Sequence, residues 1–550
     1  MDAHLSDRTR GWLRFVWDKA TTADDWSSSG EPHAWWDRDS SAPMCTFPRF
    51  DLGETAYILP VLADQTPAWR EVYARIADEL VGRHTTFWAA ADWLTLIGHD
   101  PDRDKYPPEW LGFLPERLRG HYDAPGWTGN GIDPWGLQPD PIGADGNLFF
   151  RGFFNLLLSV YRSVAGDTKW ERPFDVTGYR DRRFSWTHHG IAEFLNLQWK
   201  ERPQGPHCEN TKIWPFCLSA AGLGLQLYDG VSGSAFHGVY DEWVEYAKKH
   251  YLVLDAKGGL QNFPFYYDPI EDEMCGFPDP MVAFAALSIT PYLVPQNPEF
   301  GRFMYEEAVR KIGWNDPSKP LLSLFPDPRF LSVGLLVAQD LGDETTAKRL
   351  RQHAEEQFDP RWFGDEDDRF GWWFGLDEPW PRGQLSALQM VCEAAGPGAW
   401  SRAFREPNLD KFTQPTVEGV DYPSLAIRRA WNDPEDGVLH VGTRVGTPSR
   451  RGGTTTFRVT KLADPAAVEI HCDAELFARW RVVGEDAIEI ETEIADYEFR
   501  IATRARAVRD AEESARRVTS DPSATTGEGA RAYRPSPAAT CGCCAAGGSA

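Results

Sequence analysis

The stretch HCENTKIWPFCLSAAGLGLQLYD, residues 207–229, organises the chain. Pro215 suits the first position of a helix, and the residue before a proline avoids helical geometry, so Trp214 marks a boundary. The apolar run after Pro215 is long enough for a buried helix. Cys217 then falls in the first helical turn and Cys208 on the loop before it, an arrangement that lets the two thiols converge.

Length and composition limit the classes of protein. The 550 residues are enough for one large domain and a smaller one, and 42% hydrophobic with 13% aromatic residues indicates a folded chain. The net charge of −25 argues against nucleic acid and against an anionic membrane surface as partners.

The chain carries no sequence signal for export or for a membrane. Its first residues, MDAHLSDRTRGWLRFVWDKA, lack the apolar core of a signal peptide, and we find no uninterrupted apolar stretch long enough for a membrane helix. We therefore expect a cytoplasmic protein. The nine cysteines do not show the spacing of a small disulfide scaffold, so in a reducing compartment they are expected to be mostly free thiols.

The order of periodic segments predicts the fold class. Helical patterns recur from residues 8–20 through 147–165 and 328–341 to 383–395, joined by alternately short and long turns. Such a run fits a mainly α fold, an (α/α)6 toroid, or barrel, of helical hairpins over residues 1–410. From 415 to 505 apolar and polar residues alternate, which predicts a smaller β-sandwich-like module. Residues 506–550 turn charged and then low in complexity, and we expect a disordered tail.

The opening stretch is the strongest chemical candidate. A thiol at a helix start, Glu209 beside Cys208 and a second thiol together supply an acid, a base and a nucleophile. The alternative is that the two cysteines only pack in the core, and the sequence alone favours neither interpretation. The spacing of Cys208 and Cys217 is not that of a zinc knuckle, and we predict no metal site. Phosphate-binding glycine loops and serine-hydrolase elbows are absent from the sequence, which disfavours nucleotide cofactors.

These residues resemble the linalool dehydratase/isomerase family. The pattern Cys-Glu-Asn-x₆-Cys, followed by a Gly- and Ala-containing helix that ends in Leu227-Tyr228-Asp229, is similar to that family's signature. Asn147 to Tyr161 resembles its helix with a Lys-Gly-His-Leu-Asn-Leu run, and Tyr266-Tyr267-Asp268-Pro269 resembles its Tyr-His-Pro turn. Phe15-Val16-Trp17-Asp18 resembles a segment that carries an aspartate. We judge the resemblance to cover about residues 8–400.

The resemblance implies an α/α toroid that needs no cofactor and that adds or removes water, or moves a hydroxyl, on an allylic alcohol. It also implies a ring-shaped homo-oligomer and a small hydrophobic, terpenoid-like substrate in an apolar cavity. Residues at catalytic positions of the family are Cys208, Glu209, Cys217, Tyr267 and Asp18. Aromatic side chains that we assign to substrate binding are Phe153, Trp214 and Tyr266.

One departure from the family affects the substrate. The family's active-site histidine aligns with Phe153, and an apolar ring cannot polarise or protonate a hydroxyl. We therefore expect a terpenoid or polyene other than linalool. A carbohydrate-active enzyme, either a polysaccharide lyase or a glycosidase on a toroid with a β-sandwich, is the alternative function. A non-catalytic scaffold with an inherited cavity is the third reading.

Overall fold

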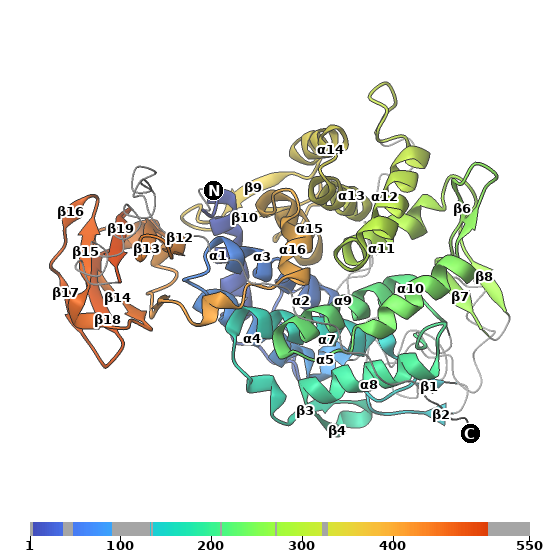
Figure 1. Ribbon diagram of the computed structural model, residues 1–550, viewed down its shortest axis with the longest axis horizontal. Coiled ribbons are helices and arrows are strands. Elements are labelled where there is room, and N and C mark those ends of the chain that lie inside the picture. Colours follow the sequence, from blue (N-terminus) through green and yellow to red (C-terminus); the bar gives the residue numbers. More distant parts are fainter. Residues whose placement is uncertain are drawn as a thin grey trace, which may run out of the picture.

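The computed structural model describes residues 4–36, 48–90, 132–133, 136–208, 212–269, 272–321 and 328–503. Within this part of the chain, helices and short hairpins come first and antiparallel strands come last, so the fold is mainly helical with sheets (Figure 1). The predicted tail at 506–550 lies outside the described residues.

Six helices contact one another in a closed cycle. In the order α2, α7, α9, α11, α13 and α15 each helix contacts the next, and α15 contacts α2 again. These helices carry few charges, because other parts of the chain cover both faces of each helix. For example, α9 contains no Lys or Arg. Their bounds are α2 Pro48–Tyr57, α7 Leu148–Ala165, α9 Pro215–Ser232, α11 Ala283–Gln296, α13 Pro328–Leu341 and α15 Gly383–Ala394.

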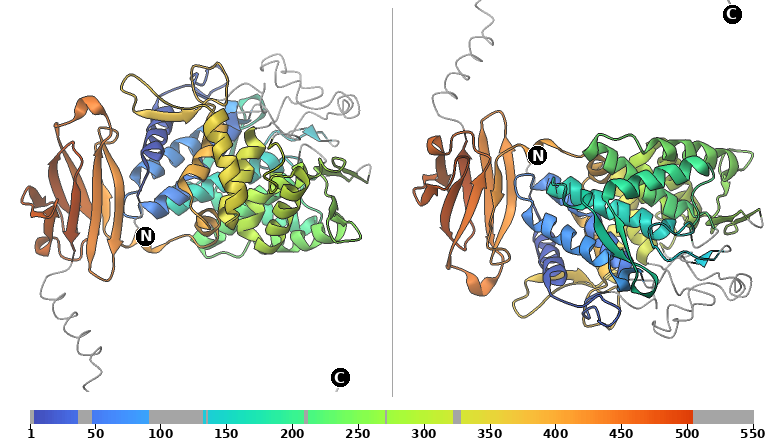
Figure 2. Two further views of the ribbon diagram at one scale, coloured as in Figure 1. Left: turned by 90° about the horizontal axis from the view of Figure 1, so that it is seen from above. Right: turned by 90° about the horizontal axis from the view of Figure 1, so that it is seen from below.

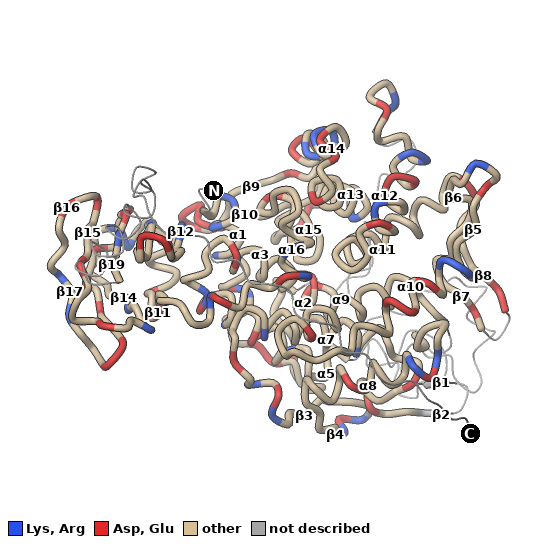
Figure 3. Tube along the Cα trace, viewed as in Figure 1, with Lys and Arg blue, Asp and Glu red and all other residues tan. Residues whose placement is uncertain are grey.

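The remaining helices lie against this cycle. For example, α4 contacts α7, α12 contacts α11, and α14 contacts α13. Charged residues are frequent on α12 and α14 (Figure 3). The bounds are α1 Asp7–Thr21, α3 Leu59–Gln65, α4 Glu71–His84, α5 Phe87–Ala90, α8 His188–Glu201, α10 Gly238–His250, α12 Pro298–Ile312, α14 Glu344–Gln357 and α16 Ala399–Arg405. None of the helices in the described ranges is both long and apolar enough to cross a membrane.

Glycines allow the closest contact within the cycle, between α7 and α9. A Cβ atom on Gly152 would lie 2.8 Å from the Cβ of Ala221, and one on Gly224 would lie 2.9 Å from the backbone nitrogen of Leu156. The two helices can therefore approach backbone to backbone, which fixes α9 and the cysteine at its start.

Two-stranded antiparallel hairpins, which the helical periodicity does not predict, connect several helices. They are β1 Ile132–Asp133 with β2 Gly136–Leu137, β3 Phe174–Thr177 with β4 Arg183–Trp186, β5 Val253–Leu254 with β6 Leu260–Asn262, β7 Tyr266–Asp268 with β8 Glu273–Cys275, and β9 Pro360–Phe363 with β10 Arg369–Trp372. The β7–β8 hairpin bears on the site, because the backbones of Tyr267 and Ile213 exchange hydrogen bonds of 2.8 and 2.9 Å.

The C-terminal strands form two antiparallel sheets, ordered β11-β14-β18-β17 and β12-β13-β19-β15-β16. Phe457 of β14 meets Phe499 of β19 with ring centroids 5.6 Å apart, so buried side chains of the two sheets touch. The bounds are β11 Thr416–Glu418, β12 Leu425–Asp433, β13 Val438–Val445, β14 Thr454–Thr460, β15 Glu469–Cys472, β16 Glu475–Leu476, β17 Trp480–Val482, β18 Ile488–Glu493 and β19 Glu498–Ala502.

Hydrogen bonds attach the sheets to the helical part, beside which they lie along the long axis (Figure 2). The backbone N–H of Ala68 donates to the carbonyl of Ala430 at 3.0 Å, and the N–H of Val417 donates to the carbonyl of Ala68 at 2.7 Å. The carboxylate of Glu71 accepts from the N–H groups of Gly419 and Val420. The sheets are thus tied to the start of α4, away from the cysteines on α9 and its preceding loop.

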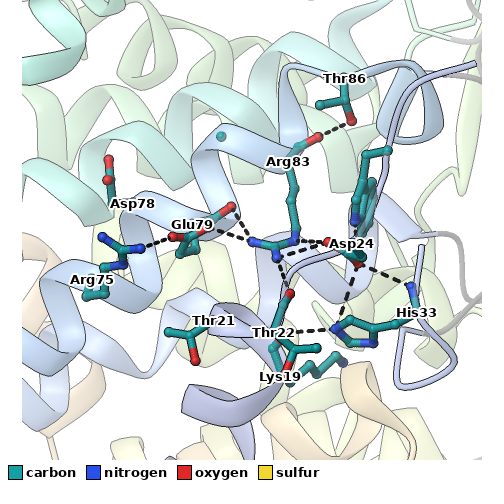
Figure 4. Close-up of polar contacts among 12 residues, drawn as sticks. Lys19, Thr21, Thr22, Asp24, His33, Arg75, Asp78, Glu79, Arg83 and Thr86 are labelled. Atoms are coloured by element: carbon teal, nitrogen blue, oxygen red, sulfur yellow. Dashed lines mark hydrogen bonds and ion pairs between the residues drawn. The ribbon is translucent and has the colours of Figure 1, made fainter. Parts of the chain in front are cut away.

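The loop after α1 is held by one carboxylate, that of Asp24, whose side chain is 4% exposed (Figure 4). Asp24 accepts from the Arg83 guanidinium at 3.0 and 3.2 Å and from the backbone N–H of His33 at 3.2 Å. Arg83 also donates to Glu79, its neighbour on α4, at 2.9 Å. This network joins α1 to α4 and is structural.

Candidate active site

The two cysteines of the opening stretch meet in the folded chain. Trp214 has an extended backbone and α9 begins at Pro215, so Cys217 stands in the first turn, as expected. Cys208 lies on the preceding loop, and its Sγ atom is 3.5 Å from the Sγ atom of Cys217. Both side chains are buried. The break between loop and helix is what brings the thiols together.

The Cys208 loop is closed by its own backbone and by a buried ion pair. The N–H of Cys208 donates to the carbonyl of Lys212 at 2.7 Å, and the N–H of Lys212 donates back at 3.1 Å. The Lys212 Nζ atom is 2.6 Å from the Asp268 Oδ2 atom on β7, and both side chains are almost wholly buried. Glu209, which we predicted as a catalytic carboxylate, follows Cys208 in the sequence and is outside the described residues.

Fixed charges lie around this loop. The buried Arg151 donates to the carbonyls of Ile142 at 2.9 Å and Asp145 at 3.1 Å. Burial lowers the pKa of Arg151 to about 10, although the charges of Asp145 and Cys208 act in the opposite direction, so Arg151 stays cationic at neutral pH. Burial lowers the pKa of His207 to about 4, and Arg202 adds to the effect, so this imidazole is neutral.

A largely apolar cavity lies inside the helix cycle and encloses about 750 Å³ of empty space, including its opening. Its walls come from α2, α9, α11, α13, α15 and α16, together with the segment before β7. Much of the lining is apolar or aromatic, including Phe216, Phe265, Phe330, Leu336, Val391 and Trp400. The polar members of the lining are Glu54, Tyr57, Ser288, Tyr292 and Arg329.

The cysteine pair adjoins this cavity through two aromatic residues. Phe216, next to Cys217 in the chain, lines the cavity and meets the ring of Tyr292 at 5.5 Å between centroids. The pKa of the Tyr292 phenol is raised well above its usual value, first by burial, then by the charge of Glu54 and also by that of Cys217. Tyr292 therefore lies within electrostatic range of both a cavity carboxylate and a cysteine.

The three aromatic residues predicted to bind substrate stand behind or beside the lining. Phe153 is buried and meets Phe216 at 5.5 Å, so it supports the wall of the cavity. Trp214 meets Phe265, a lining residue, at 5.2 Å and Tyr266 at 4.9 Å. The Nε1 atom of Trp214 is buried and makes no hydrogen bond within the described ranges. Their predicted contact with a substrate stays untested.

The structure does not place Tyr267 with the cysteines. In β7 the side chains of Tyr266 and Asp268 are buried, and Tyr267 points to the other face. Its hydroxyl donates to Asp272 at 2.8 Å and its ring meets Tyr251 at 5.5 Å. Burial, followed by Asp272, raises the pKa of Tyr267 to about 12. The β7 side chain that pairs with the cysteine loop is that of Asp268, through Lys212.

Asp18 belongs to another network. Its carboxylate accepts from Arg14 on the same helix at 2.9 Å and from Arg369 at 2.7 and 2.8 Å. Asp368 pairs with Arg14 at 3.0 Å. These contacts join α1 to the β9–β10 hairpin.

Sequence reasoning missed Glu54, Tyr57, Tyr292 and Arg329, the main polar side chains of the cavity. A signal was available for Glu54, because in a helical pattern this carboxylate shares a face with Phe50, Tyr57 and Ile58. Its partner Arg329 lies 275 residues away, and no local pattern reveals that contact. Over the described residues, His, Cys, Asp and Glu form no cluster of three or more suited to a metal ion.

The fold and the site define a class of protein: a mainly helical chain with a pair of thiols beside an aromatic cavity. Residues 127–366 match the family model of linalool dehydratase/isomerase, the family that the sequence motifs resemble. The match contains both cysteines and Phe153. It is shorter than the expected range of 8–400 and does not include Asp18 or Glu54.

Solved structures overlay only loosely. Endoglucanase CelQ from Clostridium thermocellum, complexed with cellotetraose, has a TM-score of 0.30 at 10% identity over 91% of this chain and 93% of that one. A GH127 β-L-arabinofuranosidase from Geobacillus stearothermophilus T6 has a TM-score of 0.21 at 10% identity. That overlay covers 53% of this chain and 61% of the enzyme, less than two thirds of its length. TM-scores this low support no argument about fold or activity.

Proposed function

We propose that the protein is a cofactor-independent hydro-lyase or isomerase that acts on an isoprenoid-type allylic alcohol or alkene. The observation that carries this proposal is the pair of buried thiols 3.5 Å apart beside the aromatic cavity. The family match over 127–366 supports a reaction that adds or removes water.

The chemistry follows from the kinds of group present. An acid donates a proton to the substrate hydroxyl, water leaves, and an allylic cation remains. Ring faces such as those of Phe216, Phe265 and Phe330 stabilise positive charge in a dry site. A base then removes a proton to give the alkene, and the reverse sequence hydrates it. Cys208 or Cys217 serves as the acid, or as a nucleophile that holds the carbon skeleton covalently.

Phe153 argues for a substrate other than linalool. It replaces the family's histidine, and its ring packs among Phe149, at 4.9 Å, and Phe216. This part of the wall therefore offers no proton to a hydroxyl, and it favours a hydrocarbon portion of the substrate. The apolar lining also suits a terpenoid better than a glycan, which needs a polar groove with paired carboxylates.

We extend the proposal to the architecture. The six-helix cycle, with the other helices outside it, fits an (α/α)6 toroid over residues 1–410, and the two C-terminal sheets fit a β-sandwich-like module over 415–505. A cytoplasmic homo-oligomer remains part of the proposal.

The test is a substrate screen of the purified protein. Terpene alcohols and alkenes of increasing length are incubated with it, and mass spectrometry follows the loss or gain of water. We expect turnover of at least one isoprenoid alcohol or alkene. Aryl glycosides and soluble polysaccharides form the second arm. Glycan cleavage without any isoprenoid turnover would establish the carbohydrate-active alternative, and inactivity in both arms would favour a non-catalytic scaffold.

A further inference from the structure

An ion pair stands in the wall of the apolar cavity. Glu54 of α2 is 1% exposed, and its Oε1 atom lies 2.9 Å from the Nη2 atom of Arg329 on α13. Both residues line the cavity. A buried ion pair contributes little net stability compared with apolar residues of the same size, because each charge loses its hydration. Charged groups in a cleft are therefore candidates for function.

Arg329 is itself held in place. Its guanidinium lies over the rings of Phe50, at 5.6 Å, and Phe216, at 5.4 Å from the centroid. These contacts orient the cation towards Glu54. A neighbouring cation favours the ionised form of a carboxylate, which is the form that accepts a proton.

Two neutral phenols flank the ion pair. Tyr57 is three residues after Glu54 on α2, and its ring meets that of Tyr292 at 6.3 Å. The pKa of each phenol is raised well above the usual value, mainly by burial, so both remain protonated hydrogen-bond donors at neutral pH. The Tyr57 hydroxyl is buried and has no hydrogen-bond partner among the residues described. A buried donor of this kind favours a ligand that carries an oxygen atom.

We propose that Glu54 is the catalytic base of the reaction and that Arg329 is its positioning residue. The inference rests on the proposed function. The thiol of the cysteine pair protonates the substrate hydroxyl, the C–O bond breaks, and water leaves. Glu54 removes a proton from the carbon next to the cationic centre, and those C–H electrons form the new double bond. The proton then passes from Glu54 to the thiolate through the released water, which restores both groups. Tyr57 donates a hydrogen bond to the substrate oxygen.

The substrate class follows from this arrangement. One hydroxyl must lie near the cysteines, the adjacent C–H must face Glu54, and the remaining skeleton must fill aromatic space. An alcohol with a C–H bond on the carbon next to the carbinol carbon meets these conditions, and an alcohol without such hydrogens is excluded.

The test compares Glu54→Gln with wild-type enzyme on a substrate found in the screen. The amide keeps an oxygen for Arg329 but is not a base, so kcat should fall by about 10² to 10⁴ while binding of a saturated, unreactive alcohol is kept. Glu306→Gln is the matched control, because this exposed glutamate pairs with Arg302 at 3.6 Å on the outer helix α12. The control should retain wild-type kcat.

The second measurement is the pH profile of kcat/KM. Because Arg329 favours ionised Glu54, Arg329→Met should move the acidic limb of the profile to higher pH, an effect that a purely structural role would not produce. If Glu54→Gln does not fold, this shift alone decides the matter. A folded Glu54→Gln enzyme within threefold of wild-type kcat, or an unmoved limb in Arg329→Met, would overturn the assignment. An inert wild-type enzyme would instead refute the proposed function on which the assignment rests.

Discussion

Removing one partner of the Lys212–Asp268 pair should destabilise the fold strongly. The Nζ and Oδ2 atoms are 2.6 Å apart, and the side chains are 1% and 7% exposed. Asp268→Asn removes the negative charge and leaves the ammonium of Lys212 buried, which costs about 3–5 kcal/mol in comparable pairs. Since a whole domain is stable by only about 5–15 kcal/mol, the loss is a large fraction of the total.

Urea unfolding followed by tryptophan fluorescence measures this effect as a change in the free energy of unfolding. The double variant Lys212→Met/Asp268→Leu removes both charges and should recover most of the loss. Arg302→Met, which breaks an exposed pair, is the control and should change stability by less than about 1 kcal/mol. A loss below 1 kcal/mol in Asp268→Asn would refute the view that this ion pair closes the cysteine loop.

Three further outcomes are expected. Gly224→Ala should cost about 1–3 kcal/mol because its Cβ would meet the α7 backbone, whereas Gly238→Ala, with open space around it, should be nearly neutral in the same urea assay. The pKa of His207 is about 4 in the fold and 6.5 when unfolded, so its contribution to stability is lost as pH falls through this window. Between pH 7 and pH 5 the free energy of unfolding should fall by about 2 kcal/mol because of His207 alone, and the His207→Gln variant should lose correspondingly less stability over that range. Mild oxidation with diamide should join Cys208 to Cys217, because their sulfur atoms are already 3.5 Å apart, and peptide mapping should find the disulfide.

The helices could be predicted from the sequence because apolar residues recur with helical period. The pattern at 328–341 coincides with α13, and that at 215–229 ends three residues short of α9, which closes with Gly233 in left-handed geometry. The helix α16, at Ala399–Arg405, was missed because seven residues carry too little periodicity.

The site was only partly predictable. The convergence of Cys208 and Cys217 followed from a local break at Trp214 and Pro215. The direction of Tyr267 did not, because a three-residue strand gives no phase from which to tell its two faces apart. The contact between Asp18 and Arg369 joins residues 351 apart and depends wholly on the tertiary fold.

Turnover by single cysteine variants tests the central claim most directly. The assay uses the substrate identified in the screen and compares Cys208→Ala with Cys217→Ala. The control variant is Cys472→Ala, because Cys472 lies in β15 of the C-terminal sheets. Far-UV circular dichroism and the melting temperature verify that each variant is folded. We predict that the first two lose water-addition and water-loss activity by at least about a hundredfold while Cys472→Ala keeps it. Full turnover in folded Cys208→Ala and Cys217→Ala enzymes would contradict the account.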